Sequence, residues 1–263
     1  MTPVQTSSAP TKVESVPLAS SKRKLDEDQF FNNSNVKWLG GSDKPPYTKA
    51  STYSGAVADR ERFLRETNGL TALQKHCVYF DGDADGIIWP TDTFFGFYAL
   101  GFGLILSLLA VGIIHGPFSY PTIPYTGARW RDYLPDPFFR IWIANIHRNK
   151  HGSDSESYNR KGELQRQRFD DIFDLYSTAP NKDGLSFNDL VVMITTRRNL
   201  MDPFGWFAMA FEWGSTYLLL WPSDGIVKKD DVHGIIDGSL FTSIAARRRE
   251  GLGAFHARER KQI

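Results

Sequence analysis

The sequence predicts a mainly α-helical protein, with an EF-hand-like helical domain, one membrane-inserting hydrophobic segment that ends in a proline-knot turn, and a disordered N-terminal arm. Three observations lead to this fold class. Residues 81–92, DGDADGIIWPTD, have the spacing of an EF-hand loop; residues 94–114 carry no charged side chain; and residues 1 to about 70 are polar with little periodic apolar pattern. The expected boundaries are 1–69 for the arm, 70–93 for the EF-hand region, 94–126 for the hydrophobic segment, 127–245 for a C-terminal helical region and 246–263 for a basic tail.

Composition limits the classes of partner. The chain has 263 residues, of which 41% are hydrophobic, so it can build a core. Its 31 basic residues nearly balance its 30 acidic ones, so we expect no nucleic-acid partner, and any membrane affinity must come from apolar surface. The single cysteine, Cys77, excludes an internal disulfide and multi-cysteine metal sites. Because the first twenty residues contain no run typical of a signal peptide, we expect a cytosol-facing location.

The segment 94–114 is long enough to cross a lipid layer of about 30 Å at about 1.5 Å per residue. It is followed by Pro117, Pro121 and Pro124. Proline lacks the backbone N–H and resists helix, so this cluster predicts a turn. The sequence favours a segment that dips into lipid and bends back, over one that passes straight through. A buried core helix is the alternative.

The segment 81–92 predicts a calcium site. Aspartates stand at loop positions 1, 3 and 5 (Asp81, Asp83, Asp85), Gly86 allows the sharp turn, the carbonyl of Ile87 stands at position 7 and Asp92 closes the loop at position 12. The closing residue is usually a glutamate, whose longer side chain binds through both oxygens. We therefore expect weaker calcium binding and relatively greater tolerance of magnesium than in a Glu-closed loop.

Two further segments repeat an Asp-Gly core followed by an apolar residue, at 181–190 and 222–232. Neither has the full ligand set, and the first is one residue short. Both are interpreted either as degenerate EF-hands that pack without metal or as ordinary Asp-Gly turns.

Histidines and aromatic residues give weaker signals. His76 lies five residues before the calcium loop, and His147 and His151 would share one face if their segment were an α-helix. Spacing alone fixes no metal or haem site. The stretch 204–221 is aromatic, with Glu212 as its only charge, and could line a pocket, lie at an interface or belong to the core.

Several long segments, in this order, resemble the caleosin family, also called peroxygenases: LQKHCVYFDGDADGIIWPTDTFFGFYALGF, the proline cluster, LPDPFFRIWIANIHRNKHGSDSESY, DPFGWFAMAFEWGSTYLLLW and DGSLF. The resemblance covers about residues 70–245. It implies one calcium-binding EF-hand, a proline-knot anchor to lipid droplets or endoplasmic reticulum, and a haem b held by histidines. Enzymatic members transfer one oxygen atom from a fatty-acid hydroperoxide to an unsaturated fatty acid or another acceptor.

The resemblance also assigns roles to residues. The family's two essential histidines, catalytic and haem-binding, fall on His76 and His151, and His147 is left unassigned. The calcium ligands fall on Asp81, Asp83, Asp85, the carbonyl of Ile87, and Asp92 in place of the usual Glu. The anchor falls on Pro117, Pro121 and Pro124, which are spaced more tightly than in plant members.

Two function classes follow. The first is a calcium-modulated haem peroxygenase at the cytosolic face of lipid droplets or endoplasmic reticulum, with fatty-acid hydroperoxides and unsaturated fatty acids as substrates. The second is a non-enzymatic, calcium-responsive coat or tethering protein with the same anchor. The presence of both His76 and His151 favours the enzyme, and the apolar run disfavours a soluble EF-hand sensor. Homo-oligomerisation is left open.

Overall fold

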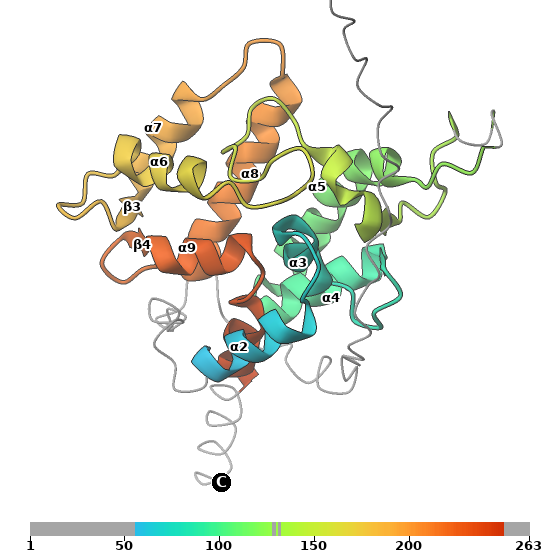
Figure 1. Cartoon of the computed structure of the whole chain (residues 1–263), viewed down its shortest axis with the longest axis horizontal. Helices are drawn as coiled ribbons and strands as arrows, with labels where there is room; N and C mark the ends of the chain where they lie inside the picture. Colours follow the sequence, from blue (N-terminus) through green and yellow to red (C-terminus); the bar gives the residue numbers. More distant parts are fainter. Residues whose placement is uncertain (1–55, 128–129, 131–132, 250–263) are drawn as a thin grey trace, which may run out of the picture.

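The computed structural model describes residues 56–127, 130 and 133–249, and their regular structure is almost entirely helical (Figure 1). The part of the predicted arm before residue 56 and the basic tail from residue 250 lie outside the described residues. Within the boundaries expected for the arm, the chain forms helix α2 (Ala56–Glu66), which buries Phe63. The arm boundary at residue 69 therefore includes an ordered helix.

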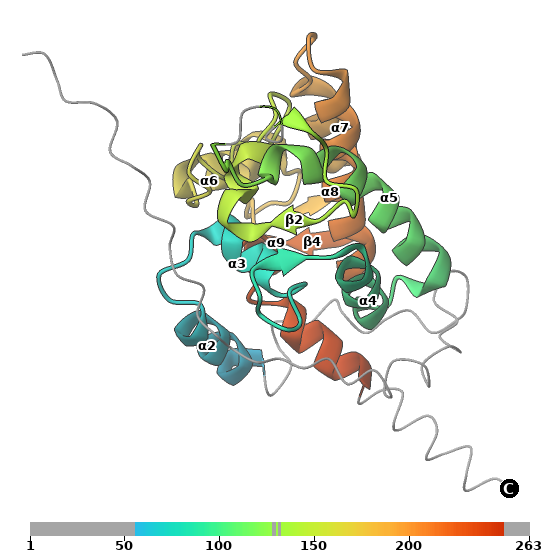
Figure 2. The ribbon, with the colours of Figure 1, turned by 90° about the vertical axis from the view of Figure 1, so that its right-hand side faces the viewer.

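The calcium loop belongs to a pair of helix–loop–helix units. The first unit is α3 (Ala72–Val78), β1 (Ile87–Ile88) and α4 (Pro90–Leu100); the second is α5 (Gly103–Thr122), β2 (Ile141–Trp142) and the 3₁₀ helix η3 (Ile143–Asn149). Strands β1 and β2 pair antiparallel, with Ile87 opposite Trp142 and Ile88 opposite Ile141 (Figure 2). The loop predicted to bind calcium is thus backed by a second loop, which lacks its ligand pattern.

A second pair has the same organisation. It consists of α6 (Arg166–Tyr176), β3 (Gly184–Ser186) and α7 (Phe187–Thr196), then α8 (Pro203–Leu220), β4 (Ile226–Lys228) and α9 (Lys229–Ile236). Strands β3 and β4 pair antiparallel, and the opposed residues Leu185 and Val227 are both buried. Strand β3 lies in the Asp-Gly segment 181–190 and β4 in the segment 222–232, and the two strands lie together in Figure 1. Their pairing between helices favours degenerate EF-hands over isolated turns.

One continuous core joins the two pairs. Helix α3 contacts both η3 and α9. Phe80, after α3, stacks on Phe97 of α4 at 5.4 Å between ring centroids and meets Phe241 edge-on at 5.6 Å. A Cβ atom at Gly96 would lie 2.3 Å from the Phe80 ring, so this close approach requires glycine.

The uncharged segment 94–114, expected to dip into lipid and bend back, is divided between two helices. Helix α4 ends at Leu100, because Gly101 adopts a left-handed conformation with φ of 97°, and α5 begins at Gly103. Such a residue after the last helical turn is a common helix stop. Helix α5 is nevertheless 20 residues long, and it is long and apolar enough to cross a membrane by length and composition.

The predicted turn at the proline cluster is wrong in its position. Helix α5 continues through Pro117 and Pro121 to Thr122, and only Pro124 lies outside it. Side chains from the η3 segment donate to carbonyls around these prolines: the Asn149 amide bonds to the carbonyl of Phe118 and the Asn145 amide to that of Thr122. This tertiary packing overrides the local resistance of proline to helix.

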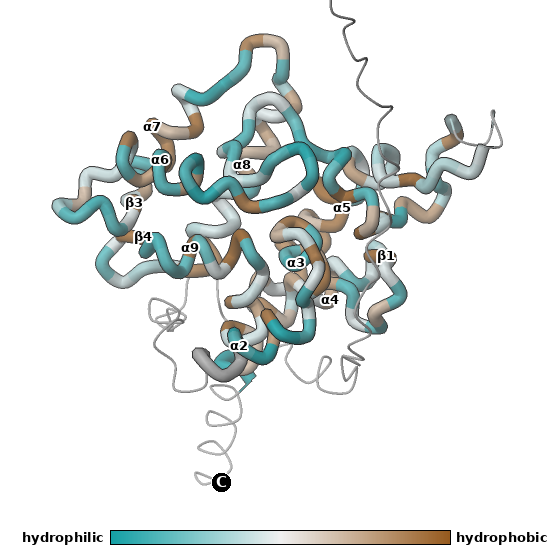
Figure 3. The backbone as a smooth tube through the Cα atoms, in the orientation of Figure 1, coloured by the Kyte–Doolittle hydropathy of each residue, from teal (hydrophilic) through white to brown (hydrophobic). Residues whose placement is uncertain are grey.

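The two faces of α5 are reversed relative to those of an ordinary surface helix. Its buried face carries polar side chains, which are Ser107, His115, Ser119 and Thr122, together with Ala110. Its exposed face carries Leu104, Ile105, Leu108 and Leu109, each more than half exposed. Figure 3 shows the hydrophobic colouring along this helix. Large apolar side chains gathered in water are costly, and such a patch marks an interaction surface.

Candidate calcium loop and histidine-lined cavity

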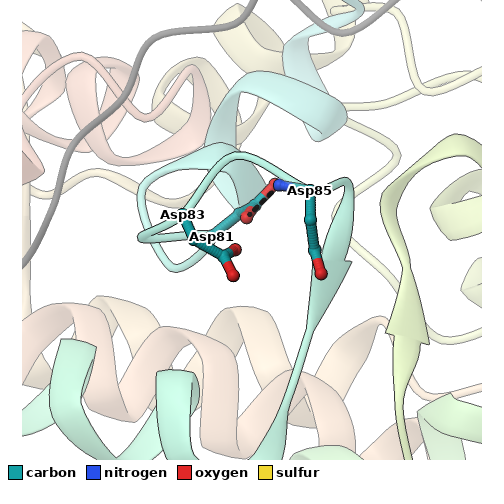
Figure 4. Close-up of side chains that lie close together, drawn as sticks. All are labelled: Asp81, Asp83 and Asp85. Carbon is teal, nitrogen blue, oxygen red and sulfur yellow. Dashed lines mark hydrogen bonds between the residues drawn. The ribbon is translucent and has the colours of Figure 1, made fainter.

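The calcium loop brings three predicted ligands together. One carboxylate oxygen from each of Asp81, Asp83 and Asp85 lies within 4.8 Å of the other two (Figure 4). Asp81 is buried and accepts hydrogen bonds from the N–H groups of Asp85 at 3.2 Å and Gly86 at 2.9 Å. Gly86 has φ of 84°, a conformation in which a side chain would be strained. Hard oxygens converging on one point form the donor set that calcium prefers.

The crowding of carboxylates has an electrostatic cost. Burial, a hydrogen bond with Asp83 and the charges of Asp83 and Asp85 raise the pKa of Asp81 to about 7, against the Gly86 N–H, which lowers it. The pKa of Asp92 is also raised, first by burial and then by Asp83 and Asp85. A divalent cation would remove this repulsion, so the residues present fit calcium.

The other two predicted ligands lie at the end of the loop. Ile87 begins β1, and its N–H donates to Asp85 at 2.7 Å. Asp92 stands in the first turn of α4, where its carboxylate accepts from the Trp89 N–H at 2.8 Å and caps the helix. It is not part of the cluster of three aspartates.

The loop that pairs with the calcium loop carries its own cation. Arg140 donates from its guanidinium to Asp136 at 2.9 and 3.1 Å and from its backbone N–H at 2.8 Å, and Asp136 is buried. The guanidinium also lies 5.1 Å from the ring centroid of Trp89 and 5.0 Å from that of Trp142. An arginine thus neutralises the carboxylate of this loop, beside the strand that pairs with β1.

A cavity of about 260 Å³ lies between the two pairs. Most of its walls are apolar, with side chains such as Phe80, Phe97, Ile114, Phe204 and Phe241. It reaches the surface beside α8, where the lining residues Phe204 and Phe207 are 42% and 54% exposed. An apolar cavity with a few polar groups is typical of a site for a small molecule or cofactor.

Both predicted histidines line this cavity. His76 comes from α3, and its Nδ1 atom lies 2.8 Å from the carbonyl oxygen of Ile235 in α9. Because a carbonyl can only accept, Nδ1 must carry the proton, which leaves Nε2 with the lone pair. Burial lowers the pKa of His76, although the Ile235 carbonyl opposes this effect. The imidazole is therefore neutral and oriented, as a metal ligand requires.

His151 has different surroundings. Its Nε2 atom lies 3.8 Å from a carboxylate oxygen of Glu212, and its buried Nδ1 atom lies 3.7 Å from Asp202, too far for a hydrogen bond. Burial lowers the pKa of His151, but the carboxylates of Glu212, Asp154 and Asp202 outweigh it and raise the pKa above its ordinary value. A Cβ atom at Gly205 would lie 2.7 Å from Nδ1, so a glycine makes room for this ring.

His147 does not share a helix face with His151. Residues 143–149 form a 3₁₀ helix and His151 lies beyond its end, so the i,i+4 relationship of an α-helix does not apply. His151 lines the cavity, whereas His147 does not.

Three further cavity residues were not predicted as site residues. Glu212 lies 61 positions after His151 in the sequence and contacts it in the fold. In the sequence, Glu212 stood out only as the single charge of an aromatic stretch. Tyr158 donates its hydroxyl to the carbonyl of Ile236 at 2.5 Å. Burial raises the pKa of Cys77 to about 12, so this cavity residue is a neutral thiol.

Fold and site together define a protein of paired helix–loop–helix units with one calcium-type loop and a histidine-lined apolar cavity. The family model of caleosin-related proteins matches residues 68–245. A peroxygenase from Lilium longiflorum is 38% identical over 177 residues, covering 67% of this chain and 70% of the relative. Probable peroxygenase 4 of Arabidopsis thaliana is 34% identical over 199 residues, covering 74% and 95%. The chain belongs to the caleosin family.

Not every relative is named as active. A probable inactive peroxygenase-like protein of Arabidopsis thaliana is 26% identical over 153 residues, covering 58% of this chain and 69% of the relative. No solved structure matches the chain. Family membership implies haem and calcium as cofactors and association with lipid membranes.

Proposed function

We propose that the chain is a calcium-binding haem peroxygenase of lipid droplets or endoplasmic reticulum, which transfers oxygen from fatty-acid hydroperoxides to unsaturated fatty acids. The observation that carries this proposal is the meeting of His76 and His151, 75 positions apart, in one apolar cavity. Relatives named peroxygenase support the reaction class.

The cavity residues fit haem. His76 would hold the iron through Nε2, since its Nδ1–H is already fixed on Ile235. The aromatic and aliphatic walls suit the porphyrin face and an acyl chain. When bound, haem supplies the redox centre for cleavage of a hydroperoxide O–O bond without electrons from a nicotinamide cofactor. Apolar side chains such as Phe97 and Phe211 line the cavity and would limit the access of water to this step.

His151 would act from a different position. A carboxylate faces its Nε2 atom at 3.8 Å, whereas no described polar atom is within hydrogen-bond distance of Nδ1. We therefore assign His151 to the wall where the hydroperoxide binds, as a proton-handling residue rather than a second iron ligand. This assignment departs from the haem-binding role that the family resemblance implies for His151.

The exposed face of α5 would hold the protein on lipid. Its buried side packs on α4, β2 and η3, so the helix is part of the folded domain. We propose that α5 lies in the surface of the lipid layer with its Leu and Ile side chains immersed, rather than crossing the layer. Exposed aromatic residues that follow it, Tyr125, Trp130 and Tyr133, suit the polar edge of a membrane. The cavity mouth beside α8 would then lie close to oxidised lipid.

The test uses the full-length protein loaded with haem. We expect a Soret band that survives desalting, and transfer of ¹⁸O from a doubly labelled fatty-acid hydroperoxide to the epoxide of oleate. An unlabelled epoxide would show that oxygen comes from another source and would contradict the reaction. Lipid binding without any retained haem would instead favour the non-enzymatic coat or tethering function.

A further inference from the structure

Helix α8 carries one charged side chain along 18 residues, and that residue faces the cavity. Glu212 lines the cavity together with Ala208 and Ser215 of the same helix, and its side chain is half exposed at the opening. A carboxylate next to so much apolar surface is costly unless it has a partner. Among the described residues, its one ion-pair partner is the Nε2 side of His151, at 3.8 Å.

Resting on the proposed function, we infer that Glu212 is a catalytic acid–base residue, which moves the hydroperoxide proton during O–O cleavage with His151 as its partner. The positions of His76 and of the Glu212–His151 pair in the cavity support this assignment. His76 is hydrogen-bonded through Nδ1 to the carbonyl of Ile235, so its Nε2 atom is the one that would hold the iron. Glu212 of α8 and His151, in the segment that follows η3, lie together elsewhere in the cavity lining.

The chemistry requires such a group. The overall reaction is ROOH + S → ROH + SO, in which the O–O bond breaks, the substrate S is oxidised by two electrons and the hydroperoxide is reduced by two. The proton on the terminal oxygen of ROOH must reach the alkoxy oxygen, which leaves as the alcohol ROH. Glu212 would take this proton and return it to the leaving oxygen, so no net proton is consumed.

Neighbouring charges set the environment of this pair. His151 faces Asp154 and Asp202 as well as Glu212, and Lys150 is occupied by Asp154 at 2.5 Å and by the carbonyl of Tyr158 at 2.7 Å. Asp202 accepts from the N–H groups of Ser153 at 2.7 Å and Gly205 at 2.8 Å, so its carboxylate is engaged in capping α8. Asp154 also lines the cavity but is paired with Lys150, so Glu212 is the lining carboxylate that has no lysine or backbone partner among the described residues.

The experiment compares Glu212→Gln, Glu212→Asp and the control Glu61→Gln, which makes the same change of charge at an exposed residue of α2 outside the cavity. Haem is titrated into the haem-free proteins, and reaction with cumene hydroperoxide is then followed across pH with product analysis. Proton-assisted heterolysis gives cumyl alcohol, whereas homolysis gives acetophenone. We expect Glu212→Gln to bind haem within about twofold of wild type, to lose about 100-fold or more in kcat and to shift products toward acetophenone.

Glu212→Asp should recover part of kcat and the acidic limb of the pH profile, and Glu61→Gln should resemble wild type. Unchanged kcat and product ratio in Glu212→Gln would overturn the inference, as would loss of haem from that variant, because Glu212 would then serve in holding the cofactor. A wild-type protein that binds no haem would instead overturn the proposed function itself, so the two failures are distinguishable.

Discussion

The Nδ1 atom of His76 lies 2.8 Å from the carbonyl oxygen of Ile235, and this contact joins α3 of the calcium-loop pair to α9 of the second pair. His76 also meets the ring of Phe241 edge-on at 5.0 Å. Its orientation thus depends on both halves of the fold, while its Nε2 atom remains available in the cavity.

The first prediction separates the roles of the histidines. His76→Ala should lose the Soret band and haem binding, because among the described residues His76 is the cavity histidine with one ring nitrogen fixed by a hydrogen bond and the other available to hold iron. His151→Ala should retain haem and lose oxygen transfer by about 100-fold or more. His147→Ala is the matched control, since this histidine lies outside the cavity, and it should behave as wild type. Haem loss in His151→Ala equal to that in His76→Ala would contradict the division.

The closing residue of the calcium loop gives the second prediction. Asp92→Glu should raise calcium affinity by about tenfold and change magnesium affinity little, because a longer side chain can bind calcium through both oxygens. Isothermal titration calorimetry measures both affinities. Asp189→Glu is the matched control: Asp189 likewise caps a helix after a loop, accepting from the Ser186 N–H at 2.8 Å, in a loop without a calcium ligand set. Equal calcium affinity in wild type and Asp92→Glu would make the closing residue irrelevant.

The third prediction is that calcium binding depends on pH. The pKa of Asp81 is raised to about 7 in the calcium-free loop, so below pH 7 calcium must displace a proton. A carboxyl group with a raised pKa stabilises the calcium-free fold at low pH, and this contribution is lost as pH rises through about 7. Apparent calcium affinity should therefore fall up to about tenfold per unit below pH 7 and level off above pH 8.

The measurement is calorimetry at pH 6 and pH 8 in buffers of different ionisation enthalpy. We expect about one proton released per calcium at pH 6 and almost none at pH 8. Asp81→Asn removes the titrating group, so its weaker binding should lose most of this pH dependence. The same affinity and no proton release at pH 6 in wild type would sink the prediction.

Local chemistry explains which parts of the structure could be predicted. The calcium loop is visible in the sequence because its ligands and Gly86 fall within twelve residues. Strand β2, which pairs with β1 at the end of that loop, could not be predicted from the sequence. Its own loop holds Arg140 in place of a metal ion and so has no ligand pattern. The proline cluster gave a wrong position for the turn, because the helix through it accepts hydrogen bonds from Asn145 and Asn149. Each of these lies more than twenty residues from its partner in the sequence. Contacts at such separations carry no local signal.

The cavity was predictable only in part for the same reason. The resemblance assigned roles to His76 and His151, but their meeting depends on α3 and the segment after η3 lining the same cavity. The contact between Glu212 and His151 was not predicted, although a single charge in an aromatic helix was a usable signal. A buried or half-buried charge among apolar residues needs a partner, and the sequence does not say which.

The fourth prediction concerns the loop that backs the calcium site. Arg140→Ala leaves the buried Asp136 carboxylate unpaired and should lower the free energy of unfolding by about 2–3 kcal/mol. It should also weaken calcium binding several-fold, because β2 supports β1. Chemical denaturation and calorimetry measure the two effects. The double variant Asp136→Asn, Arg140→Ala should recover part of the lost stability; a cycle with no coupling between the two residues would show that the ion pair contributes nothing.

The fifth prediction tests α5 as a lipid-binding surface. Ile105 is 77% exposed and Leu109 53% exposed, so the double variant Ile105→Ser, Leu109→Ser should leave the fold intact. Immersing a large aliphatic side chain in lipid is worth about 1.5 kcal/mol or more, so the pair should lower binding to phospholipid-coated oil droplets by about 100-fold. Leu175→Ser on α6, at a side chain 70% exposed, is the control and should float with the droplets as wild type does. If both variants float equally well, the reversed faces of α5 have another cause and the membrane surface must lie elsewhere on the protein.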